Sequence, residues 1–181
     1  MRKYAAYISL FLLIAGVLVG WRVEAGALGH KESIVLTVRG VPAKDVSLMA
    51  ADLDKLPHQS VRVNDKAGEK HTYEGVTVGS VLKRAGLDLD ADLHGRALTR
   101  YLLVEAADKY RVVFSLPEID PAFNDRLVLL ATRVDGKPLS EQEGPCRVIV
   151  PDEKRQARWI RQVRLLTIVD AVAPSERNKK P

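Results

Sequence analysis

The chain has little cysteine and histidine, with one cysteine and four histidines in 181 residues. A single cysteine cannot form a disulfide within the chain, so in an oxidising compartment Cys146 must be buried, bind a ligand or pair with another chain. His30, His58, His71 and His94 are scattered, and none has the spacing to cysteine that is typical of zinc sites. These absences argue against a disulfide-stapled fold, and we expect no metal site.

Several functional motifs are also missing. The chain has no Gly-rich phosphate loop, no Ser/His/Asp set in a recognisable context, no calcium-binding loop and no internal repeat. Its net charge of +5, from 28 Lys and Arg against 23 Asp and Glu, is concentrated at the two ends. Without residues 1–25 the charge is +3, and the tail over 173–181 carries +2 of that. The body is nearly neutral and has no basic helix, so we expect no nucleic acid partner.

The N-terminus has the pattern of a secretory signal peptide. A basic start with Arg2 and Lys3 precedes an uncharged, mostly apolar run from Ala5 to Gly20, and small residues near Ala25 suit a cleavage site. We expect cleavage of residues 1–25 and a periplasmic or secreted mature chain. The alternative is a retained membrane anchor. The run measures about 24 Å as a helix against a hydrocarbon core of roughly 30 Å, so we expect no stable membrane span after cleavage.

The rest of the chain predicts one domain over residues 28–172, followed by a disordered basic tail over 173–181. Alternating apolar residues predict seven strands, the second with Val61 and Val63 pointing inward. Asp135-Gly136 favours a tight type I′ turn after the fifth of these strands. The predicted strands are Ile34–Arg39, Gln59–Asn64, Leu98–Ala106, Tyr110–Ser115, Arg126–Val134, Pro145–Val150 and Gln162–Val169.

Three short helices are expected between the strands. Ser47 is a candidate cap for a helix over Leu48–Leu53, and Leu116–Asp120 is expected to form a helical turn. In the third helix Val78, Val81, Leu82 and Ala85 have helical spacing after the cap Thr77, and Gly86 follows as a C-terminal stop. Strands and helices do not alternate, so we predict an α+β fold with a mixed, barrel-like β-sheet core and short helices.

The stretch from Gly144 to Ile160 is the best candidate for a ligand site. An apolar strand leads into a loop with three cations, so Arg147, Lys154, Arg155 and Arg158 together are able to grip a phosphate, sulfate or carboxylate. The alternative is a solvated loop that is partly neutralised by neighbouring acids. Cys146 lies on the other face of the strand, where a buried apolar role is the simpler interpretation.

Two further alternatives stay open near this stretch. Trp159 either stacks on a planar ligand or anchors the core, which is the commoner role of a lone tryptophan before a strand. His58 and His71 bracket one predicted strand and loop, and form a weak metal pair only if that loop folds back.

Three sequence blocks occur in an order that resembles the molybdopterin-binding oxidoreductase domain of the sulfite oxidase fold, most closely its small secreted members. The first block is Tyr73-x-Gly75-Val76 with the helix to Gly86. The second is the Ala107–Tyr110 hairpin with Asp135-Gly136-Lys137-Pro138. The third is Gly144-Pro145-x-Arg147-Val148-Ile149-Val150-Pro151, continuing to Arg158-Trp159-Ile160. The resemblance implies that fold and a molybdopterin cofactor, with Tyr73 and Tyr110 beside the pocket.

The chain departs from the family at the metal ligand. The family's cysteine thiolate lies in the strand-to-loop region before the Tyr-x-Gly block, where this chain has Asn64 or a neighbour. Asp152 and Gln156 also stand where glycines are common in the family, and glycine lets a backbone approach a phosphate. These departures argue against a bound molybdopterin.

We therefore predict an exported, non-catalytic module that binds a small anionic ligand or an envelope protein. Its candidate ligand-binding residues are Arg147, Lys154, Arg155, Arg158, Trp159, Tyr73 and Tyr110. Two alternatives are a molybdopterin-dependent oxidoreductase and an accessory subunit or chaperone of a redox system. Whether the chain is an oxidoreductase depends on the metal-ligand cysteine, which is not found at its usual position.

Overall fold

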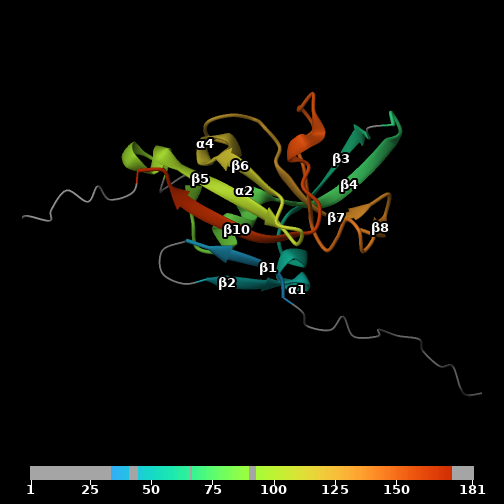
Figure 1. Cartoon of the computed structure of the whole chain (residues 1–181), viewed down its shortest axis with the longest axis horizontal. Coiled ribbons are helices and arrows are strands. Elements are labelled where there is room, and N and C mark those ends of the chain that lie inside the picture. The colour runs from blue at the N-terminus through green and yellow to red at the C-terminus, as the bar shows by residue number, and fades with distance from the viewer. Residues whose placement is uncertain (1–33, 41–44, 66, 90–92, 173–181) are drawn as a thin grey trace, which may run out of the picture. The chain divides into compact units, whose positions relative to one another are not determined.

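A computed structural model describes residues 34–40, 45–65, 67–89 and 93–172 (Figure 1). These residues form mostly strands, with a few short helices, in agreement with the predicted α+β class. The strands form two separate five-stranded sheets. The expected barrel-like core is therefore wrong for the described ranges: side-chain alternation predicts strands but carries no information on whether the outer strands pair with each other.

The first sheet is mixed, as predicted. Its order is β2 (Val46–Met49), β1 (Ile34–Arg39), β10 (Val163–Asp170), β5 (Arg100–Ala106) and β6 (Arg111–Ser115). Strands β1 and β10 are parallel, and the other pairs are antiparallel. One face of this sheet packs into the core with Leu36, Val38, Leu102, Val104, Phe114, Leu166 and Ile168.

The second sheet is antiparallel. Its order is β3 (His58–Asn64), β4 (Lys70–Thr77), β7 (Leu129–Val134) and β8 (Lys137–Pro138), and β9 (Arg147–Ile149) also pairs with β7. Val63 is buried and Val61 is half-buried against the core, as predicted for β3. Asp135 and Gly136 join β7 to β8 with φ values of 49° and 74°, as a type I′ turn requires.

Gly75 explains why the Tyr-x-Gly block needs a glycine. It lies in β4 at an irregularity in the pairing with β7. A Cβ at this position would lie 2.1 Å from the carbonyl oxygen of Leu130 and 2.6 Å from the Cα of Ala131. Because both contacts are with backbone, the two strands can approach this closely only without a side chain.

Helix α2 (Val78–Arg84) has the predicted caps. The Thr77 hydroxyl accepts a hydrogen bond from the Ser80 amide at 3.1 Å. At the other end Gly86 has a φ of 101°, and the Leu87 amide donates to the Leu82 carbonyl at 3.0 Å. The buried side chains Val78, Val81 and Leu82 hold this helix on the core.

The remaining helices are short. Those that lie wholly within the described residues are α1 (Ala50–Asp54), α4 (Leu116–Ile119) and the 3-10 turns η1 (Gly95–Thr99) and η2 (Gln156–Arg158). The predicted cap Ser47 is wrong, because Ser47 pairs with Thr37 within β2. Helix α1 starts three residues later, where the Met49 amide donates to the Asp52 carboxylate at 3.1 Å. Strand pairing therefore overrides the local capping preference.

In the described ranges, no helix is long and apolar enough to cross a membrane. The expected signal peptide over 1–25 and the basic tail over 173–181 lie outside those ranges.

Candidate functional site

A cleft of about 1070 Å³ lies where parts of both sheets meet. Strand β4 and the β7–β8 turn form one side, and the β5–β6 turn forms another. The segments on either side of β9 and the loop from η2 to β10 complete it. Its polar and aromatic lining residues are Asp65, His71, Tyr73, Asp108, Tyr110, Asp135, Gln142, Glu143, Arg147, Gln156, Trp159, Arg161 and Gln162.

Arg147 is a largely buried cation in this cleft, with a side chain only 13% exposed. Its Nη1 donates to the Tyr73 hydroxyl at 2.9 Å and to the Glu143 carboxylate. The guanidinium carbon also lies 5.3 Å from the centre of the Tyr73 ring. The buried Nε has no hydrogen-bond acceptor among the described residues. Within the described ranges, the charge of this cation is therefore compensated by one carboxylate alone, that of Glu143.

Tyr73 is buried and holds this arginine in position. Burial raises the pKa of its hydroxyl, while the nearby Arg147 opposes that rise. The phenol therefore stays protonated at neutral pH. It accepts from Arg147, and its own proton is available to an acceptor in the cleft.

A second polar cluster lies at the tips of the β3–β4 and β7–β8 hairpins. The His71 Nδ1 lies 2.7 Å from Asp135, and its Nε2 lies 3.8 Å from Asp65. The hydrogen bond with Asp135 raises the pKa of His71, and the same contact lowers the pKa of Asp135. This pair is therefore a local ion pair whenever His71 is protonated.

Unusual backbone geometry gathers around the cleft. Within the described ranges, the non-glycine residues with positive φ are Lys109, Asp135 and Gln162. Lys109 and Asp135 are hairpin-turn residues, whereas Gln162 has a φ of 50° in a connecting loop. Its amide donates to the Glu143 carbonyl at 2.8 Å and its carbonyl accepts from the Ala107 amide at 3.0 Å. Backbone held in a sparsely populated conformation is often found at binding sites.

Four of the seven predicted ligand residues meet in the cleft: Tyr73, Tyr110, Arg147 and Trp159. The Tyr110 hydroxyl donates to the Ala157 carbonyl at 3.0 Å, which fastens the η2 loop to the β5–β6 hairpin. Trp159 is buried, and its Nε1 donates to the Val150 carbonyl at 2.9 Å. Trp159 therefore anchors the core and also lines the cleft.

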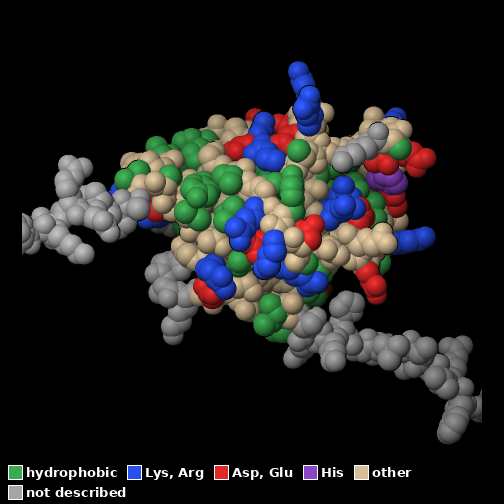
Figure 2. Space-filling view, viewed as in Figure 1, with side chains coloured by type: hydrophobic (Ala, Val, Ile, Leu, Met, Phe, Trp, Pro, Cys, Tyr) green, Lys and Arg blue, Asp and Glu red, His purple; other side chains and the backbone are tan. Residues whose placement is uncertain are grey.

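The other three predicted cations do not join Arg147. Lys154 and Arg155 are exposed and are not part of the cleft lining. Figure 2 shows Lys or Arg side chains projecting from the loop that is coloured orange in Figure 1. Arg158 donates to Glu153 through Nε at 2.6 Å and to Glu118 through Nη2 at 2.8 Å, and it also lies over the Phe114 ring. The structure therefore does not assemble the four-cation site.

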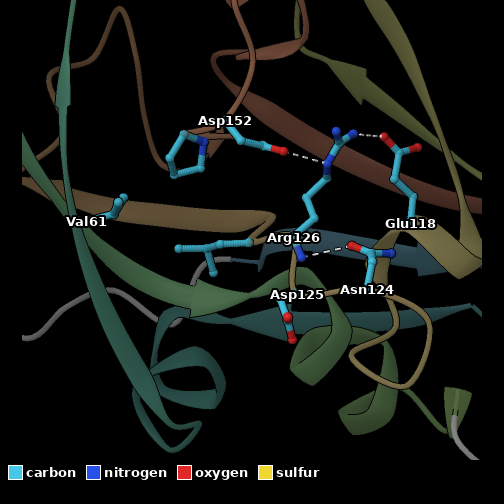
Figure 3. Close-up of a pocket in the computed structure, with 8 residues that line it drawn as sticks. Val61, Glu118, Asn124, Asp125, Arg126 and Asp152 are labelled. Atoms are coloured by element: carbon cyan, nitrogen blue, oxygen red, sulfur yellow. Dashed lines mark hydrogen bonds and ion pairs between the residues drawn. The ribbon is translucent and has the colours of Figure 1, made fainter.

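Arg126 extends this ion-pair network and lines a second cavity of about 740 Å³ (Figure 3). It lies between Glu118 and Asp152, with its Nε 2.9 Å from the Asp152 carboxylate. Asp152 and Glu153, which partly neutralise the cations of this loop, therefore form structural ion pairs. Together with Glu118, Arg126 and Arg158 they connect the loop before η2 to helix α4.

The sequence patterns did not predict Arg161, Gln162, Glu143 or the three aspartates of the cleft. Glu143 had a usable signal, because it stands four residues before Arg147 and pairs with it. The aspartates Asp65, Asp108 and Asp135 resembled ordinary turn residues. Only the tertiary structure brings their turns to one cleft.

The cysteine does not suit a metal site. Cys146 is fully buried, and burial raises the pKa of its thiol to about 12. At the family's ligand position, the backbone carbonyl of Asn64 accepts a hydrogen bond from Gln156 at 2.7 Å. In the described part of the chain no three His, Cys, Asp or Glu side chains form a metal-binding group. The residues present therefore do not fit a thiolate-bound molybdenum centre.

The histidine pair is also not formed. His58 pairs with Val76 and His71 pairs with Val63, so the two lie at opposite ends of the β3–β4 hairpin. The run of β4 from position 71 to position 76 spans about 17 Å. The loop does not fold back to bring their imidazoles together.

Comparisons with known proteins agree on the fold. A family model described as "oxidoreductase molybdopterin binding domain" matches residues 27–176. Among solved structures, the sulfane dehydrogenase SoxCD from Paracoccus pantotrophus is similar, with a TM-score of 0.59 and 20% identity. The match covers 80% of this chain and 40% of the SoxCD chain, so this chain spans less than half of that neighbour's length. The comparison with curated proteins gave no match.

Proposed function

Because this chain belongs to the oxidoreductase molybdopterin-binding domain family, we propose that it uses the family's fold as a non-catalytic module that binds a small anionic ligand. The ligand site is the cleft around Arg147. We also propose that the chain is exported to the periplasm or secreted, on the basis of its N-terminal pattern. Its ligand or protein partner would therefore be found in the cell envelope.

The observation that carries the proposal is the state of Arg147. It is a mostly buried guanidinium with a single carboxylate partner, Glu143, and its buried Nε has no acceptor in the described ranges. Leaving a buried charged donor unsatisfied costs free energy, typically about 1–3 kcal/mol. The Nε itself is enclosed, so a bound anion would contact the exposed part of the guanidinium and compensate its charge there.

Arg161 supplies a second cation at the same site. It lines the cleft, is exposed, and has no ion pair or hydrogen bond with another described residue. An anion placed between Arg147 and Arg161 would receive charge-assisted hydrogen bonds from both side chains. Tyr73 would add its hydroxyl proton, since that oxygen already accepts from Arg147.

A redox role would need a metal ligand that the described cleft does not offer. The family cofactor is a pterin that carries molybdenum, and the resemblance assigns its protein ligand to a cysteine thiolate. Here the sole cysteine is buried in the core with a strongly raised pKa. Family membership alone favours the second candidate function, a molybdopterin-dependent oxidoreductase.

Titration of small anions tests the proposal. Sulfate, phosphate and acetate should be titrated calorimetrically at low ionic strength into the native protein, Arg147→Gln and Arg155→Gln. At least one anion should bind the native protein and Arg155→Gln equally and lose binding to Arg147→Gln. Arg155 is the matched control, because it is an exposed cation outside the cleft. Equal binding to all three proteins would overturn the proposed site.

A further inference from the structure

We infer that the ligand of this cleft is dipolar, with an ammonium group as well as an anionic group, as in a short peptide with both termini unblocked. This inference rests on the proposed function and narrows it to a ligand class. It starts from the charges that the cleft presents, which are of both signs.

Two of the four cleft carboxylates are already matched. Glu143 accepts from Arg147, and Asp135 accepts from the His71 imidazole and from the Thr72 amide. These contacts neutralise charge inside the protein. Because Glu143 and Asp135 already have these partners, a cationic group of the ligand would gain little by binding to them.

The other two carboxylates, Asp65 and Asp108, are less well compensated: backbone amides are their hydrogen-bond donors, and neither has a close cationic partner in the described ranges. One oxygen of Asp65 accepts from the Glu69 amide at 2.8 Å, and the other lies 3.8 Å from His71. One oxygen of Asp108 accepts from the Tyr110 amide at 2.9 Å, and its side chain has no ion pair in the described ranges. Negative charge therefore remains at Asp65 beside the β3–β4 turn and at Asp108 in the β5–β6 turn, as positive charge remains at Arg161.

A ligand with charge of one sign would meet like charge at some point in this cleft. An anion that fills it approaches Asp65 and Asp108, and a cation approaches Arg147 and Arg161. Like charges in close contact discriminate strongly against a wrong ligand. A molecule with one group of each sign can place its ammonium near an aspartate and its anionic group near an arginine.

The size and lining of the cleft favour a peptide over a single amino acid. Its volume of about 1070 Å³ lies just above the usual range for ligand pockets, roughly 300–1,000 Å³. Val134, Trp159 and Ile160 provide apolar contacts for side chains. The lining amides Gln142, Gln156 and Gln162 suit the backbone N–H and C=O groups of a peptide.

The test uses the tripeptide Ala-Leu-Ala in four forms: unblocked, N-acetylated, C-amidated and blocked at both ends. Each is titrated calorimetrically into the full chain at low ionic strength. The unblocked form should bind, each singly blocked form should bind at least 10-fold more weakly, and the doubly blocked form should not bind. Blocking one terminus removes one charge and hardly changes size, so the series separates the two charges.

Variants should show a crossed pattern. Asp65→Asn and Asp108→Asn should each weaken the unblocked and C-amidated forms, and neither should weaken the N-acetylated form, because the like charge near its carboxylate is removed. Arg161→Gln should weaken the unblocked and N-acetylated forms and should not weaken the C-amidated form, because the like charge near its ammonium is removed. Arg155→Gln is the control and should change none. Two separate aspartate variants keep the test valid if one of them fails to fold.

The failures of the two ideas are distinguishable. If the N-acetylated peptide binds as tightly as the unblocked one, the dipolar ligand is wrong while the anion site stands. If no peptide binds but sulfate, phosphate or acetate binds in a way that depends on Arg147, the dipolar ligand is again wrong and the anion site stands. If neither peptides nor anions bind to the folded protein, the proposed function itself is wrong.

Discussion

Cys146 and Arg147 are neighbours in sequence but belong to different environments at the start of β9. The Cys146 side chain is fully buried in the core, whereas Arg147 lines the cleft between β4 and the loop before β10. Strand geometry alternates side chains between two faces, so the thiol cannot reach a ligand that Arg147 holds. This separation leads to two predictions about the thiol.

The first prediction is that the thiol is unreactive in the folded protein. The thiolate is the reacting species, and burial raises the pKa of Cys146 to about 12. Iodoacetamide at pH 8 should label the native protein at least about 100-fold more slowly than the protein in 6 M guanidinium, as followed by mass spectrometry. Comparable rates in the two conditions would show that the thiol is accessible.

The second prediction concerns molybdenum. The full chain, expressed in a molybdenum-replete host with its own N-terminal segment, should be purified without molybdenum or pterin, because no thiolate is available to the metal. Elemental analysis and pterin fluorescence after oxidation measure both. Stoichiometric molybdenum and pterin that disappear in Cys146→Ser would establish the oxidoreductase alternative instead.

Local signals predicted the elements well, whereas the site needed tertiary information. Helical spacing, Thr77 and Gly86 correctly located α2, and Asp135-Gly136 correctly indicated the turn between β7 and β8. These features depend on residues near one another in sequence. The partners of Arg158 could not be predicted in this way, since Glu118 lies 40 positions away in sequence. The local charge pattern suggested an anion site where the fold makes ion pairs.

The third prediction is that Arg158 acts on stability. Replacing it with leucine removes the hydrogen bonds of Arg158 with Glu153, Glu118 and the Val113 carbonyl, and it leaves the largely buried Glu153 carboxylate without its cation. Arg158→Leu should lower the free energy of unfolding by about 2 kcal/mol. Arg155→Gln, in the same loop but exposed, should stay within about 0.5 kcal/mol of the native value. Urea denaturation measures both, and equal stability of the two variants would contradict the network's role.

The fourth prediction tests the close approach of β4 and β7. Gly75→Ala should destabilise the protein by about 3 kcal/mol, because its Cβ would overlap the backbone of Leu130 and Ala131. Gly79→Ala is the control: a Cβ there lies 3.5 Å from its nearest neighbour, which is ordinary contact. As an alanine within α2, it should be neutral or stabilising by up to about 1 kcal/mol. A Gly75→Ala protein as stable as Gly79→Ala would mean that the strands can separate at this point.

The last prediction is a pH dependence of stability from His71 and Asp135. Their hydrogen bond raises the pKa of His71, so the protonated imidazole stabilises the fold below the ordinary histidine value of 6.5. This contribution is lost as pH rises through the raised pKa. The pKa of Asp135 is lowered, so its contribution is present above 3.8 and is lost as pH falls through the lowered value. The pair therefore stabilises the fold most between about pH 4 and pH 6.5.

Urea unfolding at pH 6 and pH 9 should show that His71→Gln loses part of the native pH dependence. His58→Gln, an exposed histidine at the far end of the hairpin, should keep all of it. The same pH profile in native protein and His71→Gln would rule out this ion pair as its source.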